Sequence, residues 1–123
     1  MTKETLKFIS DVLTAAGINY EFGQWSGEIV YPYWVGEYIE QAYSPEDGYQ
    51  ETTFTLNGFS RTTWLDLENA KEIIERLFSN SVQILQSGNG VCIFYEGTTI
   101  IPENDAELKR MQIDLTIKEW KVN

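Results

Sequence analysis

The sequence contains no histidine and only one cysteine, Cys92. Without histidine, neither a Ser-His-Asp triad nor a Cys-His pair can form, and no imidazole is available to bind a metal ion. A single cysteine excludes an internal disulfide bond, a CxxC redox pair and a zinc site built from thiolates. Most catalytic and metal chemistry is therefore excluded, and we expect a protein that is not an enzyme and uses no cofactor.

Basic residues are scarce, and they are unevenly placed. The chain has 9 Lys+Arg against 19 Asp+Glu, a net charge of -10, which argues against a general nucleic-acid binder because such proteins need a basic surface. One region of the fold should carry a strongly negative surface, of which the simplest interpretation is a solvated face that aids solubility. No basic residue occurs between Lys7 and Arg61, where the acidic residues are Asp11, Glu21, Glu28, Glu37, Glu40, Glu46, Asp47 and Glu51.

Long apolar runs are also missing. The longest nearly apolar stretch, residues 29–35, includes Pro32 and is far shorter than the roughly 20 residues of a membrane-spanning helix. The first residues mix charge into an amphipathic pattern, unlike a signal peptide. We therefore expect a soluble protein of the cytoplasm with no membrane partner, and the 123 residues suit a single domain over residues 1–123.

The first segment has the periodicity of an amphipathic helix. Leu6, Ile9 and Leu13 fall on one face, Thr2 can cap the start, and Gly17 can end the helix.

A second helix follows Thr63 and ends near residues 79–80. Its apolar stripe contains Leu67, Ala70 and Ile74. Thr63 with Asp66 three residues later resembles a capping box, although glutamate or glutamine is preferred at the second position.

The remaining segments have the patterns of β-strands. The last one alternates strictly between apolar and polar residues, as a half-buried antiparallel strand does. The turn cluster at 44–48 predicts that the strands before and after it form a long protruding hairpin around an acidic, flexible loop. Together with the helices, these strands predict an α+β fold, a mostly antiparallel sheet with two helices packed on one face. The expected strands are 18–22, 34–43, 50–60, 82–85, 91–95 and 108–120.

No set of residues with convergent chemistry stands out. Glu37 and Glu40 are three apart on a predicted strand, so their side chains should point to opposite faces and not form an acid–base pair. Glu46 and Asp47 lack a third ligand at the spacing of a calcium loop. Cys92 lies between apolar neighbours, which favours a buried and inert thiol.

Aromatic residues gather in the stretch that lacks basic residues. Because neighbouring residues of a strand point to opposite faces, one of Tyr33 and Trp34 should be exposed in a monomer. Exposed aromatic side chains beside acidic ones suit a protein–protein contact. A strand that is buried on both faces explains the same pattern equally well.

The whole arrangement resembles the tail-terminator and tail-completion (minor tail) proteins of tailed bacteriophages and prophages. The resemblance covers nearly the full chain and includes the YPYWV strand at 31–35 and the segment TFTLNGFSRTTWLDLENAKEII at 53–74. It implies a structural virion protein, a subunit of a homo-oligomeric ring, often hexameric, at the tail end or the head–tail junction. The implied partners are further copies of itself, the tail tube protein and the head-completion or connector proteins. The implied location is the tail of the virion, with assembly in the host cytoplasm.

In such a ring the acidic stretch acquires a role, because a negative lumen lets DNA pass without binding it. Two other interpretations stay open. One is another phage assembly part, such as a head-closure or minor capsid protein; the other is a small dimeric α+β module that binds a ligand in an aromatic pocket. The candidate residues for the lumen or the interface are Trp34, Glu37, Glu40, Glu46, Asp47, Tyr49 and Glu51.

Overall fold

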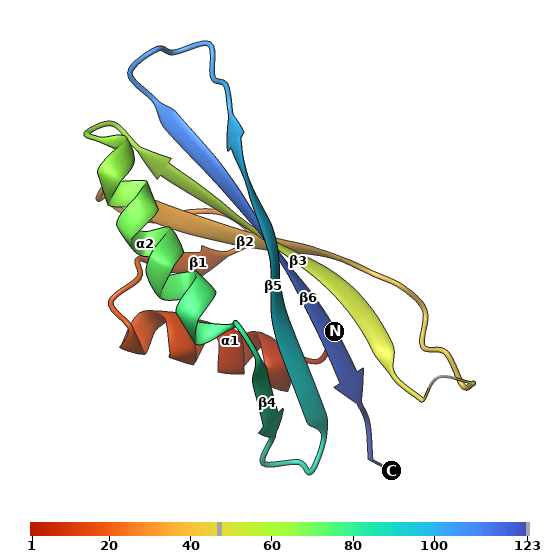
Figure 1. The fold of residues 1–123 in the computed structure, drawn as a ribbon. Helices are drawn as coiled ribbons and strands as arrows, with labels where there is room; N and C mark the ends of the chain where they lie inside the picture. The colour runs from red at the N-terminus through yellow and green to blue at the C-terminus, as the bar shows by residue number, and fades with distance from the viewer. Residues whose placement is uncertain (47, 123) are drawn as a thin grey trace.

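The computed structural model describes residues 1–46 and 48–122. It contains two helices and one six-stranded sheet, so the predicted α+β fold is confirmed (Figure 1). In chain order the elements are α1 (Lys3–Ala15), β1 (Tyr20–Phe22), β2 (Tyr33–Glu40), β3 (Gln50–Ser60), α2 (Trp64–Leu77), β4 (Ser81–Ile84), β5 (Gly90–Ile101) and β6 (Lys109–Trp120).

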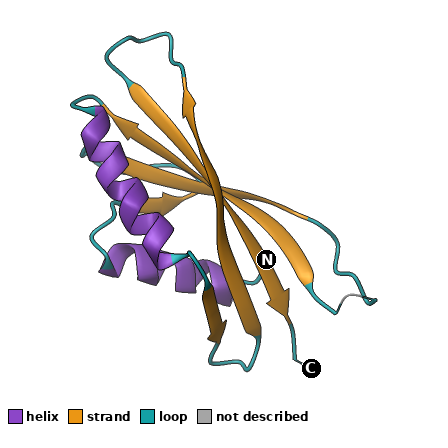
Figure 2. Cartoon of the chain, in the orientation of Figure 1, coloured by secondary structure: helices purple, strands orange, loops and turns teal. Residues whose placement is uncertain are grey.

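The strands lie in the order β1-β2-β3-β6-β5-β4 and form a strongly twisted sheet (Figure 2). Every neighbouring pair is antiparallel except β1 and β2, which are parallel. β2 and β3 pair from Tyr33 with Phe59 to Glu40 with Thr52, which is the predicted antiparallel hairpin. β6, the strand with the strictest alternation, lies between β3 and β5 at the centre of the sheet.

Three strands differ clearly in length from their predictions. β1 begins at Tyr20, two residues after its predicted start. β5 extends to Ile101, well past the predicted end at Tyr95, and its register with β6 shifts between Tyr95 and Gly97. The apolar run of residues 91–95 ends at this bulge, and the ladder with β6 continues beyond it. β2 ends at Glu40 because, of the predicted residues 41–43, only Gln41 continues the ladder, donating its N–H to the Glu51 carbonyl at 3.0 Å.

Both helices begin at the threonines that the sequence indicated. The Thr2 hydroxyl accepts the N–H of Thr5 at 3.1 Å, and the Thr63 hydroxyl accepts the N–H of Asp66 at 3.3 Å. Each side chain thus satisfies one backbone donor of the first helical turn. After α1 the chain turns at Gly17, whose φ of 84° is in the left-handed region that favours glycine.

The core lies between the two helices and one face of the sheet, which we call the helix face (Figure 2). The two helices contribute the apolar stripes that the sequence predicted. The sheet contributes alternate residues of its central strands, as a half-buried sheet should. Fully buried core residues include Ile9, Leu13, Leu67 and Ile74 of the helices, Phe54 and Leu56 of β3, Ile93 of β5, and Met111, Ile113, Leu115 and Ile117 of β6.

Tyr20 introduces a polar group into the edge of this core. Its hydroxyl is buried and has no hydrogen-bond partner among the described residues. Burial raises the pKa of Tyr20 well above its ordinary value of 10.0. The folded protein therefore resists ionisation of this tyrosine at a pH where the unfolded chain loses the proton.

We expect Tyr20→Phe to leave stability at pH 7 unchanged or to raise it by up to about 1 kcal/mol, because the hydroxyl makes no bond. Above about pH 10 the unfolded wild-type chain binds fewer protons than the folded one, so stability falls as pH rises, and phenylalanine removes this loss. Urea unfolding at pH 7 and pH 10.5 measures both effects, with Tyr43→Phe as the exposed control. A Tyr20→Phe variant that loses stability at pH 7 would contradict the assignment.

A candidate assembly surface

No described helix covers the second face of the sheet, which we call the open face. Strand alternation and the pairing register assign its side chains, which are polar in the centre and apolar or aromatic toward both ends. A sheet face of this kind is available to a partner. The open face comprises Glu21 of β1; Tyr33, Val35, Glu37 and Ile39 of β2; Glu51, Thr53, Thr55, Asn57 and Phe59 of β3; Arg110, Gln112, Asp114, Thr116, Lys118 and Trp120 of β6; Gly90, Cys92, Phe94, Gly97, Thr99 and Ile101 of β5; and Val82 and Ile84 of β4.

The centre of the open face is held by hydrogen bonds between strands. Asn57 donates to Glu37 at 3.3 Å and accepts from the Arg110 guanidinium at 2.8 Å. The Thr55 hydroxyl donates to Asp114 at 2.9 Å. These bonds cross β2, β3 and β6 and hold the charged side chains in place, so the open face presents a fixed charge pattern.

An aromatic cluster lies at the end of the open face near β1. The ring centroid of Tyr33 lies 5.0 Å from that of Trp25, 5.6 Å from that of Tyr31 and 5.1 Å from that of Phe59. The Arg110 guanidinium lies 5.7 Å from the centroid of the Phe59 ring. Burial is the main cause that raises the pKa of Tyr33. The cluster is half-buried, with the Tyr33 and Phe59 rings stacked and the Trp25 and Tyr31 rings tilted against Tyr33.

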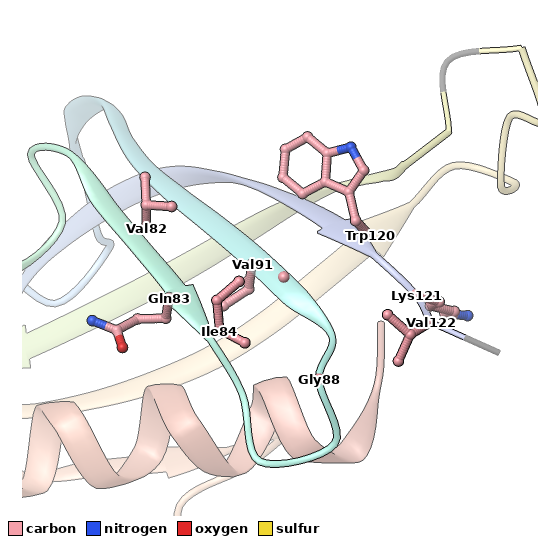
Figure 3. Close-up of a pocket in the computed structure, with 9 residues that line it drawn as sticks. Val82, Gln83, Ile84, Gly88, Val91, Trp120, Lys121 and Val122 are labelled. Carbon is pink, nitrogen blue, oxygen red and sulfur yellow. The ribbon is translucent and has the colours of Figure 1, made fainter.

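An apolar groove of about 320 Å³ lies at the opposite end of the open face (Figure 3). Its apolar side chains include Val82 and Ile84 of β4, and Trp120 and Val122 at the end of β6. Gly90 separates Ile84 from Trp120 in the ladder and has no side chain to fill the gap. Val82 and Ile84 are 64% and 75% exposed. We call this the β4 groove.

Tyr49 borders the β4 groove from the other side. Its ring packs against Trp120 with centroids 5.5 Å apart, and the Lys118 ammonium lies 5.0 Å from the Tyr49 ring centroid. Tyr49 is half-buried, so part of this predicted interface residue is already covered by its own chain.

The prediction that Trp34 faces the lumen or a neighbouring subunit is wrong. Its side chain is 1% exposed and belongs to the core, where Gly58 leaves the space for the ring: a Cβ atom on Gly58 would lie 2.6 Å from it. Of the adjacent pair it is Tyr33 that reaches the open face, and it too is half-buried.

The predicted acidic residues divide between the two faces. Glu37 and Glu51 lie on the open face, whereas Glu40 lies on the helix face, as the spacing of Glu37 and Glu40 predicted. The Glu40 carboxylate accepts a hydrogen bond from the amino group of Met1. Glu46 is exposed in the connection between β2 and β3, and Asp47 lies outside the described residues.

Sequence reasoning did not single out the β4 groove. Its walls come from segments about 36 residues apart, which only the sheet order brings together. A signal for it is nevertheless present, because residues 77–95 form the longest stretch without a charged residue in this chain. Cys92, within that stretch, is buried as predicted.

Within residues 1–46 and 48–122, no three or more Cys, Asp or Glu side chains are grouped so that they could hold a metal ion. No helix in the described part of the chain is long and apolar enough to cross a membrane. A scan against protein-family models and a search of the curated proteins found no match to this chain.

Proposed function

We propose that this chain is a structural subunit of a phage tail, a tail-terminator or tail-completion protein that acts by assembly and not by catalysis. Copies of it form a closed ring at the tail end or the head–tail junction, in contact with the tail tube and the head-completion proteins. The observation that carries this proposal is the open face, a six-stranded surface that the chain's own helices leave uncovered while all core residues lie on the other side.

In the proposed ring the open face lines the lumen and the helices lie outside. The carboxylates of Glu37 and Glu51 then point toward the DNA path. Their negative charge repels phosphate, so DNA passes without being held. Glu40 has no part in this, because it lies on the helix face and contacts Met1.

Light scattering over a range of protein and salt concentrations tests the proposal. Six chains of 14.2 kDa give a ring of about 85 kDa, the closed assembly that symmetry favours. A stable dimer would instead favour a small ligand-binding module, for which the β4 groove is the site of suitable size. A protein that stays monomeric at every concentration and does not bind purified tail tubes contradicts the proposal.

A further inference from the structure

β4 is a four-residue edge strand that lacks several of the features that protect an edge. It is last in the sheet order, and no described strand pairs with its outer side. Ser81–Ile84 contains no charge, proline or bulge, which are the common means of preventing edge-to-edge pairing. The Leu85 N–H bonds to the Asn89 carbonyl at 2.8 Å, so antiparallel alternation directs the N–H and C=O groups of Val82 and Ile84 outward.

The opposite edge of the sheet is open over part of its length. β1 pairs with β2 only at Trp34–Gly36, and no described strand pairs with the outer side of β2 beyond it. The Gln41 N–H bonds to the Glu51 carbonyl, so the alternation directs the backbone groups of Tyr38 and Glu40 outward. Ile39 is 79% exposed at this edge.

The free parts of these two edges lie at the same position along the strand direction. The ladder connects Glu40 to Ser81 in single steps through Thr52, Ile117 and Ile93. β2 and β4 also run in the same direction, because four successive antiparallel pairings separate them: β2 with β3, β3 with β6, β6 with β5, and β5 with β4. A second copy related by rotation about an axis along the strands can therefore place its β2 edge beside β4 as a parallel strand.

The side chains at the two edges are matched in polarity. Ile39 lies on the open face, as do Val82 and Ile84, so apolar groups would meet on the same side of a joined sheet. Tyr43, two residues beyond Gln41 in the connection that follows β2, is 45% exposed and would add a further apolar side chain if the partner extends the strand.

Charge favours the same contact. Each copy has a net charge of -10, so two copies repel unless a neutral or basic surface faces the acidic stretch. Residues 77–95, which include β4, carry no charge, and Lys121 lies at the β4 groove. The acidic edge with Glu37 and Glu40 thus meets a segment that contributes no carboxylate of its own, and the Glu4 carboxylate next to this segment is bound by the N–H and hydroxyl of Ser87.

We infer that β4 of one copy pairs in parallel with residues 39–43 of the next copy, so that the sheets of neighbouring subunits become continuous. This inference rests on the proposed ring and names its interface. Ile39 and Tyr43 of one copy then pack against Val82 and Ile84 of its neighbour and close the β4 groove from its outer side. The contact is head-to-tail, and each copy offers one β4 edge and one β2 edge, as a closed ring requires.

Cysteine cross-linking tests this pairing directly. Ala42 and Gln83 are both exposed. Each lies two residues after one of the positions that the ladder connects, Ala42 after Glu40 and Gln83 after Ser81, so the two side chains should be neighbours in the proposed pairing. The double variant Ala42→Cys/Gln83→Cys, treated with a short bismaleimide, should give a ladder of covalent oligomers up to the closed ring. Each single variant alone should remain uncross-linked, and an equal mixture of the two should give covalent dimers only. The wild-type protein, whose only cysteine is buried, is the control.

A second variant tests the apolar contact. Val82→Lys/Ile84→Lys places two charges on the β4 edge and should reduce the solution mass sixfold, from the ring to the monomer. Ile29→Lys/Val30→Lys is the matched control, because it adds the same two charges and these side chains are 51% and 54% exposed in the connection between β1 and β2. Circular dichroism and urea unfolding verify that each variant is folded.

The outcomes separate this inference from the proposed function. Cross-linking of Gln83→Cys alone would show a two-fold β4–β4 contact and overturn the head-to-tail pairing. A ring of about 85 kDa without cross-links in the double variant would place the interface elsewhere, so the inference fails while the proposed function stands. A wild-type protein that is monomeric at every concentration and gives no cross-links contradicts the inference as well.

Discussion

Replacing Trp34 with alanine is expected to lower the free energy of unfolding by about 3–5 kcal/mol, the range for removing a fully buried aromatic side chain from a core. The indole is 1% exposed, and its ring occupies the space above Gly58. Alanine leaves a cavity there that β3 cannot close, because Gly58 is held in register with Trp34 on one side and with Met111 on the other.

Urea unfolding followed by circular dichroism measures this loss as a fall in the midpoint at unchanged slope. Trp64→Ala is the control, because Trp64 is 39% exposed at the start of α2, and it should lose less than half as much. Equal losses in the two variants would show that Trp34 does not have the core role that its burial indicates.

Gly58→Ala should be destabilising for the converse reason. The added methyl group would lie 2.6 Å from the Trp34 ring, and overpacking of this kind costs about 1–3 kcal/mol. In the Trp34→Ala background the same methyl group fills part of the cavity, so the two changes together should cost less than their sum. A double-mutant cycle measures this coupling.

Local patterns in the sequence were sufficient for the helices and for most of the strands. Thr2 and Thr63 could be recognised as caps because a side-chain oxygen is needed where backbone donors are free, and β3 has the bounds that its pattern predicted. The second half of β5 could not be recognised, since the apolar run of residues 91–95 ends at Tyr95. Pairing with β6 keeps that segment extended, and this pairing is a tertiary effect.

The candidate site was less accessible to sequence reasoning. Alternation showed that Tyr33 and Trp34 point to opposite faces, but only the position of Gly58 on the neighbouring strand decides which of them is buried. In the same way, Glu37 and Glu40 could be placed on opposite faces without knowing which face the helices cover. The β4 groove joins Ile84 to Trp120 across β5, so it depends wholly on the strand order.

If the open face lines the lumen of the proposed ring, reversing charge on this face is expected to make the protein bind DNA. Glu37→Lys/Glu51→Lys replaces two carboxylates of the open face and changes the net charge from -10 by four, to -6. If six copies face one lumen, twelve lysines line the DNA path, and each phosphate contact releases counterions. We expect a short labelled duplex to bind at least about tenfold more tightly at low salt, and to dissociate steeply as salt rises.

The matched control is Glu68→Lys/Glu72→Lys, which makes the same change in net charge on α2, outside the proposed lumen. Fluorescence anisotropy of the duplex, measured between about 50 and 200 mM salt, compares the two variants, and light scattering verifies that both assemble alike. Because total charge is equal, tighter binding by the open-face variant can come only from where its lysines lie. Equal binding by both variants would show that the open face does not line the path of DNA. A ring that still forms would then have another surface of the subunit facing its lumen.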